Sequence, residues 1–160
     1  MRSPLEEHPK ILEKIGLFIV LFNIIDTLLN VRFYFIIIQT DKKNQPIMNN
    51  LISQDFSRKL DALENVLGEE IHSIIKDINE FRNFIAHGSY GMNELKGMSI
   101  TKVKRYTGKY QSVTLSEKIM DEHIENERKT VNEIYKLNLL TMQQGGLLNA
   151  QQVKEAIDSL

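Results

Sequence analysis

The sequence predicts a mainly α-helical protein, an up-and-down helical bundle with one β-hairpin inserted between its helices. Long stretches of the chain repeat apolar residues at helical spacing, and one short region alternates as β-strands do. The composition, 42% hydrophobic and 26% charged residues, is ordinary for a folded protein. The length of 160 residues predicts a single domain over 1–160, because domains usually hold about 100–200 residues.

The most apolar stretch, residues 15–38, lies within a long helix predicted over about residues 10–39. It is long enough to cross a bilayer, but Asp26 and Arg32 fall inside it, and each costs about 2.5–3.5 kcal/mol at the centre of a membrane. Four polar residues within it stand at i, i+3, i+4 and i+7, which is one stripe of a helix. We therefore expect a buried helix with a polar stripe and no membrane association. The stripe consists of Asn23, Asp26, Thr27 and Asn30.

Two more helices are predicted in the first half of the chain, beyond a polar linker over residues 41–50. The first covers about residues 53–66, and Gly68 is expected to end it. The second covers residues 69–87 and is followed by Gly88. The apolar face of this second helix consists of Ile71, Ile74, Ile75, Ile78, Phe81 and Ile85.

A β-hairpin is predicted over about residues 98–115, where both strands alternate and β-branched residues are frequent. Thr107-Gly108-Lys109 is the turn between the strands. A last long helix then runs to about Gln143, and residues 149–160 form a short terminal helix.

Net charge and cysteine content exclude several classes of function. The net charge of −1 means that any contact with nucleic acid must come from a local basic patch. The absence of cysteine excludes disulfides, thiolate metal sites and cysteine nucleophiles, and it suits a reducing compartment. No histidine stands at a metal-binding spacing, and no secretory signal is apparent, so we expect a cytoplasmic protein without metal or other cofactor.

Arg82 breaks the apolar pattern of the helix over residues 69–87. On a helical wheel that advances about 100° per residue, Arg82 lands among the apolar residues. Burying an unpaired charge costs several kcal/mol, so Arg82 must find a partner, a ligand or a wet cleft. Departures of this kind are expected at functional sites.

His87 lies five residues after Arg82, about 140° farther around an ideal helix. Asn83 and His87 are four residues apart and share a face. One ideal helix therefore does not easily bring Arg82 and His87 to the same phosphate. Two solutions are open: the helix loosens at its Gly88 end, or a second protomer supplies part of the site, which predicts a symmetric homodimer.

The segment Arg82-Asn83-Phe84-Ile85-Ala86-His87 matches an Arg-Asn-x-x-x-His signature. In this segment the chain resembles the HEPN domain family, helical-bundle proteins common in toxin–antitoxin and antiviral systems. The specific match covers this one segment, while the helical layout extends the likeness over most of the chain. The resemblance implies a metal-independent endoribonuclease that acts on RNA as a homodimer, with the motif in a cleft between protomers.

The same resemblance implies a role for each motif residue. Arg82 would neutralise the scissile phosphate, Asn83 would orient His87 or the phosphate, and His87 would act as general base or acid. Histidine titrates near neutrality and planar arginine matches phosphate oxygens, so the chemistry is sensible in itself. Some family members carry a tyrosine, modified by a nucleotidyltransferase partner, two residues after the histidine. Ser89 holds that position here, and Tyr90 follows it, so modification of Tyr90 by such an antitoxin partner stays an open expectation.

The hairpin combines basic and aromatic residues, with no acid between Lys96 and Tyr110. This combination suits single-stranded RNA, through phosphate contacts and base stacking. It also suits a solvated hairpin whose lysines keep the sheet edge from pairing, and the sequence leaves both interpretations open. The candidate RNA-binding residues are Lys102, Lys104, Arg105, Tyr106 and Lys109.

Each part of the candidate site also has a purely structural interpretation. Arg82 and His87 are cations near a helix C-terminus, where the helix dipole favours them. Asn23 and Asp26 either form a solvated face or support the site, with Asp26 as the counter-ion of Arg82. The second hypothesis for the whole chain is a catalytically inactive HEPN-like module that binds a partner protein or a nucleotide.

Overall fold

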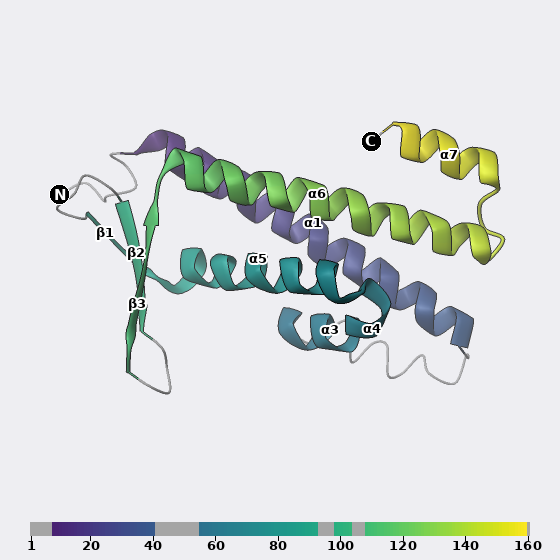
Figure 1. The fold of residues 1–160 in the computed structure, drawn as a ribbon, viewed down its shortest axis with the longest axis horizontal. Coiled ribbons are helices and arrows are strands. Elements are labelled where there is room, and N and C mark those ends of the chain that lie inside the picture. Colours follow the sequence, from purple (N-terminus) through teal and green to yellow (C-terminus); the bar gives the residue numbers. More distant parts are fainter. Residues whose placement is uncertain (1–7, 41–54, 93–97, 104–107, 160) are drawn as a thin grey trace. The chain divides into compact units, whose positions relative to one another are not determined.

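The computed structural model describes residues 8–40, 55–92, 98–103 and 108–159. This part of the chain forms six helices and three strands, so the prediction of a mainly helical protein is confirmed (Figure 1). The predicted linker over residues 41–50 lies outside it. The helices are α1 (Pro9–Thr40), α3 (Phe56–Ala62), α4 (Glu64–Leu67), α5 (Glu69–His87), α6 (Glu117–Gln144) and α7 (Ala150–Asp158).

The sheet has three antiparallel strands, β1 (Ser89–Met92), β2 (Met98–Val103) and β3 (Tyr110–Leu115), in that order. The predicted hairpin is present as β2 and β3, with Ile100 opposite Val113. The prediction of only two strands was nevertheless wrong, because β1 also pairs with β2. β1 has only four residues, one of them glycine, and no β-branched residue, so it lacks the alternation by which the other strands were found.

The prediction of one continuous helix over residues 53–66 was also wrong. Residues 53–54 lie outside the described part, and the rest forms two short helices, α3 and α4. The chain leaves the α-helical pattern at Leu63, whose N–H bonds to the carbonyl of Leu60 at 3.0 Å, an i→i+3 bond. Gly68 ends α4 with φ +81°, a conformation that glycine adopts without steric cost.

Side-chain caps set the starts of the last two helices. The hydroxyl of Ser116 accepts a bond of 3.2 Å from the N–H of Ile119 at the start of α6. Asn149 and Gln152 form a reciprocal capping box at the start of α7, with bonds of 2.9 and 3.0 Å.

The chain groups into two compact units, Met1–Phe22 with Asp77–Glu127, and Asn23–Lys76 with Arg128–Leu160. Three helices, α1, α5 and α6, contribute one part to each unit. The single domain expected over 1–160 stays a prediction.

The first unit contains the whole sheet and the C-terminal half of α5, which ends where β1 begins (Figure 1). Lys14 on α1 forms an ion pair with Asp121 on α6. One face of the sheet carries Ile100 and Leu115, both buried, because opposite residues of antiparallel strands share a face. The buried apolar residues of this unit are Ile11, Ile15, Phe18, Phe22, Ile78, Phe81, Phe84, Ile85, Met98, Ile100, Leu115, Met120 and Ile124.

Buried polar groups join α1 to α6 in the second unit. Arg32 donates to the carbonyl of Leu137 at 2.9 Å and to the hydroxyl of Thr141, and burial lowers the pKa of Arg32. The side-chain amide of Asn138 donates to the carbonyl of Leu28 at 3.1 Å. None of the helices in the described ranges has the length and apolarity needed to span a membrane.

Gly88 lies where the end of α5 passes close to β2. A Cβ at this position would stand 2.0 Å from Cγ2 of Ile100 and 2.6 Å from the carbonyl oxygen of Phe84. Ile100 is fully buried, so it has no free space into which to move. The glycine is therefore required by the close approach of helix and sheet.

We predict that Gly88→Ala lowers the free energy of unfolding by about 1–3 kcal/mol, because the added methyl overpacks the junction. Denaturant unfolding followed by circular dichroism measures this change. Gly91→Ala in β1 is the matched control: its Cβ would have no neighbour closer than 3.9 Å, so we expect a change within about 0.5 kcal/mol. Equal effects of the two substitutions would show that the close approach is not a constraint.

Candidate functional site

The motif residues lie in the last two turns of α5, which stays helical as far as His87. Two contacts anchor this end of the helix. Gly88 packs against β2, and the hydroxyl of Tyr90 on β1 donates to the carbonyl of Ile85 at 2.6 Å. The carbonyls of a last helical turn lack helical partners, so Tyr90 acts as a cap. Loosening of the helix, one of the two solutions expected for the motif, is therefore not seen.

Arg82 is half-buried and makes two contacts. Its guanidinium lies 5.4 Å from the ring centroid of Phe22 on α1, and its Nη1 donates to Oδ1 of Asn83 at 3.3 Å. Within the described residues no carboxylate reaches Arg82 as an ion-pair partner. A guanidinium has five N–H donors, so most of its capacity to bind an anion is unused by these contacts.

His87 is exposed at the last position of α5. Asn83 lies between Arg82 and His87 on the helix surface, about 100° from Arg82 and 40° from His87. The bond from Arg82 to Asn83 turns the guanidinium toward the side on which His87 stands. The three residues thus form a continuous polar strip near the C-terminal end of the helix dipole, which favours cations.

Of the hairpin cations with described positions, Lys102 lies against the motif helix. It lies on β2 two residues after Ile100, so both side chains share the face of the sheet that contacts α5. Its Nζ stands 5.9 Å from the ring centroid of Phe84, which is itself a residue of the motif. Lys109 is described and exposed, whereas Lys104, Arg105 and Tyr106 lie outside the described residues.

The polar stripe of α1 has a different partner from the one expected. Asp26 forms an ion pair with Lys59 of α3, and the amide oxygen of Asn30 accepts a bond of 3.2 Å from the same ammonium. Lys59 is buried, with 5% of its side chain exposed, so Asp26 compensates a buried charge within the second unit. Asn23 is exposed, and its carbonyl accepts from the hydroxyl of Thr27 at 2.9 Å.

The burial of Lys59 had a signal in the sequence that we did not use. Phe56, Leu60 and Leu63 define the apolar face of this region, and Lys59 stands three residues from Phe56 and four from Leu63. A lysine on an apolar face needs a carboxylate partner, and Asp26 on the preceding helix was available.

Tyr90 is half-buried, and burial raises the pKa of its hydroxyl. The hydroxyl is engaged with the carbonyl of Ile85, so a group attached to its oxygen would have to break that bond. The structure thus gives Tyr90 a positioning role at the end of α5.

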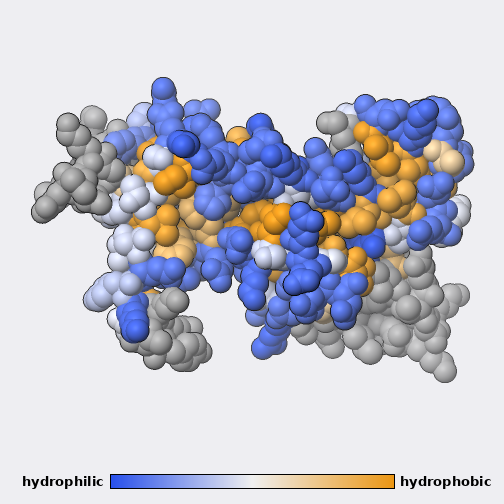
Figure 2. All heavy atoms as spheres, in the orientation of Figure 1, coloured by the Kyte–Doolittle hydropathy of each residue, from blue (hydrophilic) through white to orange (hydrophobic). Residues whose placement is uncertain are grey.

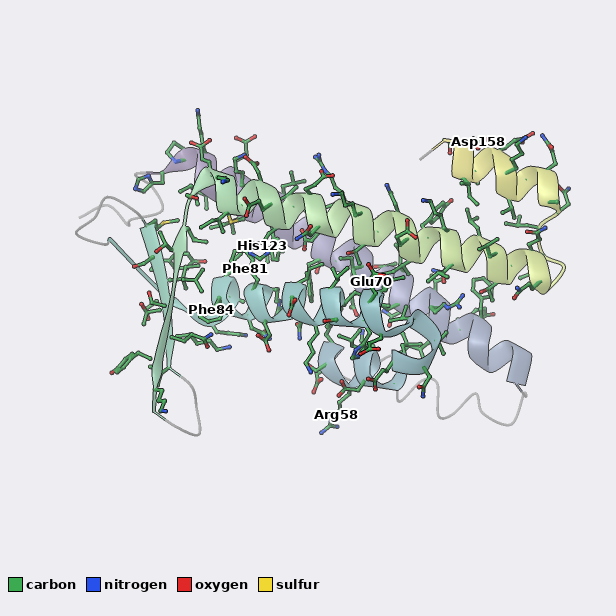
Figure 3. All side chains as sticks on the ribbon, viewed as in Figure 1. Arg58, Glu70, Phe81, Phe84, His123 and Asp158 are labelled. Carbon is green, nitrogen blue, oxygen red and sulfur yellow. The ribbon has the colours of Figure 1, made fainter. Side chains whose placement is uncertain are left out.

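His123 belongs to an aromatic cluster that the sequence did not reveal. Its ring stacks on Phe81 with centroids 3.5 Å apart and an interplanar angle of 8°. The edge of Phe18 meets both rings, with centroids 5.2 Å from Phe81 and 6.2 Å from His123. Figure 3 shows His123 on α6 directed toward Phe81 on α5. Burial lowers the pKa of His123, while the nearby carboxylates of Glu122 and Asp77 act in the opposite direction.

Glu127 on α6 is fully buried, and neither carboxylate oxygen meets a hydrogen-bond donor among the described residues. Burial raises its pKa to about 9, so the carboxyl is protonated near neutral pH. The sequence contained the signal, because Glu127 stands three residues after Ile124 and seven before Ile134, on the same face of the helix.

Neither metal clusters nor known relatives identify the site. Among the residues with described positions, no three histidine, aspartate or glutamate side chains group closely enough to hold a metal ion. No protein-family model matches the chain, and neither a curated protein nor a solved structure matches it. The geometry of the motif therefore carries the functional argument.

We predict that Asp26→Ala lowers the free energy of unfolding by about 1–3 kcal/mol, because it leaves the ammonium of Lys59 buried without a carboxylate. The estimate is below the usual cost of breaking a buried pair, since 35% of the Asp26 side chain is exposed. The double variant Asp26→Ala, Lys59→Met removes both charges and should recover most of the loss. Chemical denaturation of both variants tests this, and an unchanged Asp26→Ala protein would argue against a structural role.

We predict that His123 makes the protein less stable in acid. Its pKa is lowered on folding, so its contribution to stability is complete above the unfolded pKa of about 6.5 and is lost as the pH falls through the folded value. His123→Phe keeps an aromatic ring against Phe81 without a titrating group. Unfolding measured at a series of pH values should show a shallower acid loss in this variant, and identical pH profiles would rule out the contribution.

Proposed function

We propose that the chain is a metal-independent endoribonuclease of the HEPN type, active as a homodimer in the cytoplasm as a toxin or antiviral defence effector. The observation that carries this proposal is the state of Arg82. A half-buried guanidinium sits on an aromatic ring, bonded to Asn83, with no carboxylate partner among the described residues. A partly buried cation without a counter-ion loses some of its hydration without compensation, and an anionic ligand such as a phosphate would compensate it.

His87 supplies the proton transfer in this proposal. Its imidazole is exposed, so it can reach a bound RNA, and the ring nitrogens of histidine can accept and donate a proton. His87 takes the proton of the ribose 2′-hydroxyl, and the resulting oxygen attacks the adjacent phosphorus. The bond to the 5′-oxygen breaks, that oxygen takes up a proton, and the products carry a 2′,3′-cyclic phosphate and a 5′-hydroxyl. General acid–base catalysis of this type contributes about 10²–10⁴-fold.

The spacing of the motif favours a site built by two copies. Arg82 and His87 are separated by about 7.5 Å along the axis of α5 and by about 140° around it. Because α5 stays helical through His87, this separation is fixed in one chain. Two motifs that face each other would place Arg82 of one copy near His87 of the other. His87 of the second copy could then protonate the leaving 5′-oxygen.

Lys102 extends the proposed site on the sheet side. Its ammonium lies over Phe84, which is part of the motif segment. A lysine at this place would contact a phosphate next to the scissile one, and Lys104, Arg105, Tyr106 and Lys109 follow it in the sequence as further RNA contacts.

A catalytically inactive module that binds a partner protein or a nucleotide is the second candidate. The exposure of His87 favours it, because no described residue orients the imidazole as a base requires. In this case Arg82 would still bind an anion, without cleavage. Modification of Tyr90 by a nucleotidyltransferase partner stays a prediction, and it would require the hydroxyl to leave the carbonyl of Ile85.

We predict that the purified full chain cleaves single-stranded RNA in EDTA, and that Arg82→Ala and His87→Ala each reduce the rate by about 10²-fold or more. The first variant loses the phosphate contact and the second loses the proton transfer. Cleavage of a panel of end-labelled RNAs, followed on denaturing gels, measures the rates.

Two matched variants control this experiment. Arg58→Ala removes an exposed arginine of α3, and His123→Phe removes a half-buried histidine that is stacked on Phe81; both should keep the wild-type rate. All variants are compared by thermal unfolding to exclude loss of the fold. RNA binding without cleavage by any form, with binding lost in Arg82→Ala, would replace the nuclease by the binding module.

A further inference from the structure

The strand β3 forms one edge of the sheet. The strand order is β1-β2-β3, and β3 pairs with β2 alone among the described strands. Alternate residues of an edge strand direct their N–H and C=O groups away from the sheet. At alternate positions along its outer edge, β3 therefore presents backbone groups that pair with no other described strand.

The sequence of β3 carries none of the features that usually protect an edge strand from pairing. The segment Tyr110–Leu115 contains no charged residue, no proline and no glycine, and it forms no bulge in its register with β2. The residues of β3 are mostly exposed, and Figure 2 shows pale, neutral side chains over this end of the sheet. Tyr110 is 77% exposed, which is unusual for a large aromatic residue.

The side chains of β3 suit a second copy of the same strand. We call the face of the sheet that contacts α5 the inner face and the opposite one the outer face. On the outer face, Ser112 already lies opposite Thr101, whose hydroxyl stands 3.3 Å from that of Ser112. On the inner face, Val113 lies opposite Ile100. Hydroxyl pairs and pairs of β-branched residues both stabilise antiparallel strands. β3 could repeat both kinds of pair across its free edge.

We propose that β3 pairs antiparallel with β3 of a second copy, which joins two three-stranded sheets into one. The inner faces of both sheets must stay on the same side of the joined sheet. This requires one residue of β3 to lie directly opposite the same residue of the other copy, with the two-fold axis midway between them. With the axis at Val113, Ser112 lies opposite Thr114 of the other copy. Lys109 then stands level with Glu117 of the other copy, so opposite charges meet at both ends of the joined strands.

This pairing does not depend on ribonuclease activity, but it has a consequence for it. The inner face of each sheet contacts the end of its own α5, through Gly88 and Tyr90. A two-fold axis perpendicular to the joined sheet places both α5 ends on the same side of it. A protein that dimerises through β3 yet cleaves no RNA would keep this inference and lose the proposed function.

The test is the mass of the full chain in solution, measured by light scattering at rising concentration. We predict that the wild type reaches twice the 18.6 kDa of one chain. Ser112→Lys with Thr114→Lys places lysines opposite lysines and should give a monomer. Ser112→Glu with Thr114→Glu should also be monomeric, and a mixture of the two variants should recover the dimer, because opposite charges then meet.

A second measurement does not depend on the folding of the charged variants. The natural chain has no cysteine, so Val113→Cys introduces a single thiol at the proposed axis. Directly opposed residues of antiparallel strands have Cα atoms about 4.5–5.5 Å apart, which a disulfide can bridge. Ser99→Cys on the central strand is the matched control and should not cross-link. A monomeric wild type at every concentration, or equal cross-linking of the two cysteine variants, would overturn the proposal.

Discussion

The close approach of α5 to β2 at Gly88 is the constraint on which the candidate site depends. Side-chain atoms of Ile100 occupy the space that a Cβ would need, and the hydroxyl of Tyr90 binds the carbonyl of Ile85 one turn earlier. Together these contacts hold the last turn of α5 against the sheet. The positions of Arg82, Asn83 and His87 on a regular helix follow from this anchor, since a frayed end would release His87 first. The sheet is thus more than an insertion between helices, because it holds the end of the helix that carries the motif.

Two titrating groups of the first unit make its stability change with pH in opposite directions. Glu127 is buried without a hydrogen-bond donor among the described residues, and its pKa is raised to about 9. Its contribution is complete below the unfolded pKa of about 4.5 and is lost as the pH rises through the folded value. His123 has the opposite sign, because burial against Phe81 lowers its pKa. We therefore expect neither group alone to set the pH of maximum stability.

Periodicity predicted most of the fold, since α1, α5, α6, α7, β2 and β3 lie close to their expected bounds. Periodicity failed at β1, because its four residues are too few to show an alternating pattern. It also failed at Leu63, where a local i→i+3 bond divides a helix that the apolar spacing predicts as continuous. The Arg-Asn-x-x-x-His segment marked the candidate site, and the half-burial of Arg82 followed from its place on the helical wheel. Arg82 contacts Phe22, Asp26 forms an ion pair with Lys59, and His123 stacks on Phe81. These partners could not be predicted, because the two residues of each pair are far apart in the sequence and meet only when the helices pack. Charges on apolar faces, such as Lys59 and Glu127, were the signals that sequence reasoning left unused.

The central claim, that Arg82 and His87 cleave RNA through its own 2′-hydroxyl, is tested most directly at a single nucleotide. A cleavage site is first mapped in EDTA, and the RNA is then made again with a 2′-deoxynucleotide on the 5′ side of that bond. We predict that the natural RNA yields a 2′,3′-cyclic phosphate and a 5′-hydroxyl, and that the substituted bond stays intact while other sites are still cut. Continued cleavage at the 2′-deoxynucleotide, or products with a 5′-phosphate, would contradict the account, because a nucleophile other than the 2′-hydroxyl would then be at work.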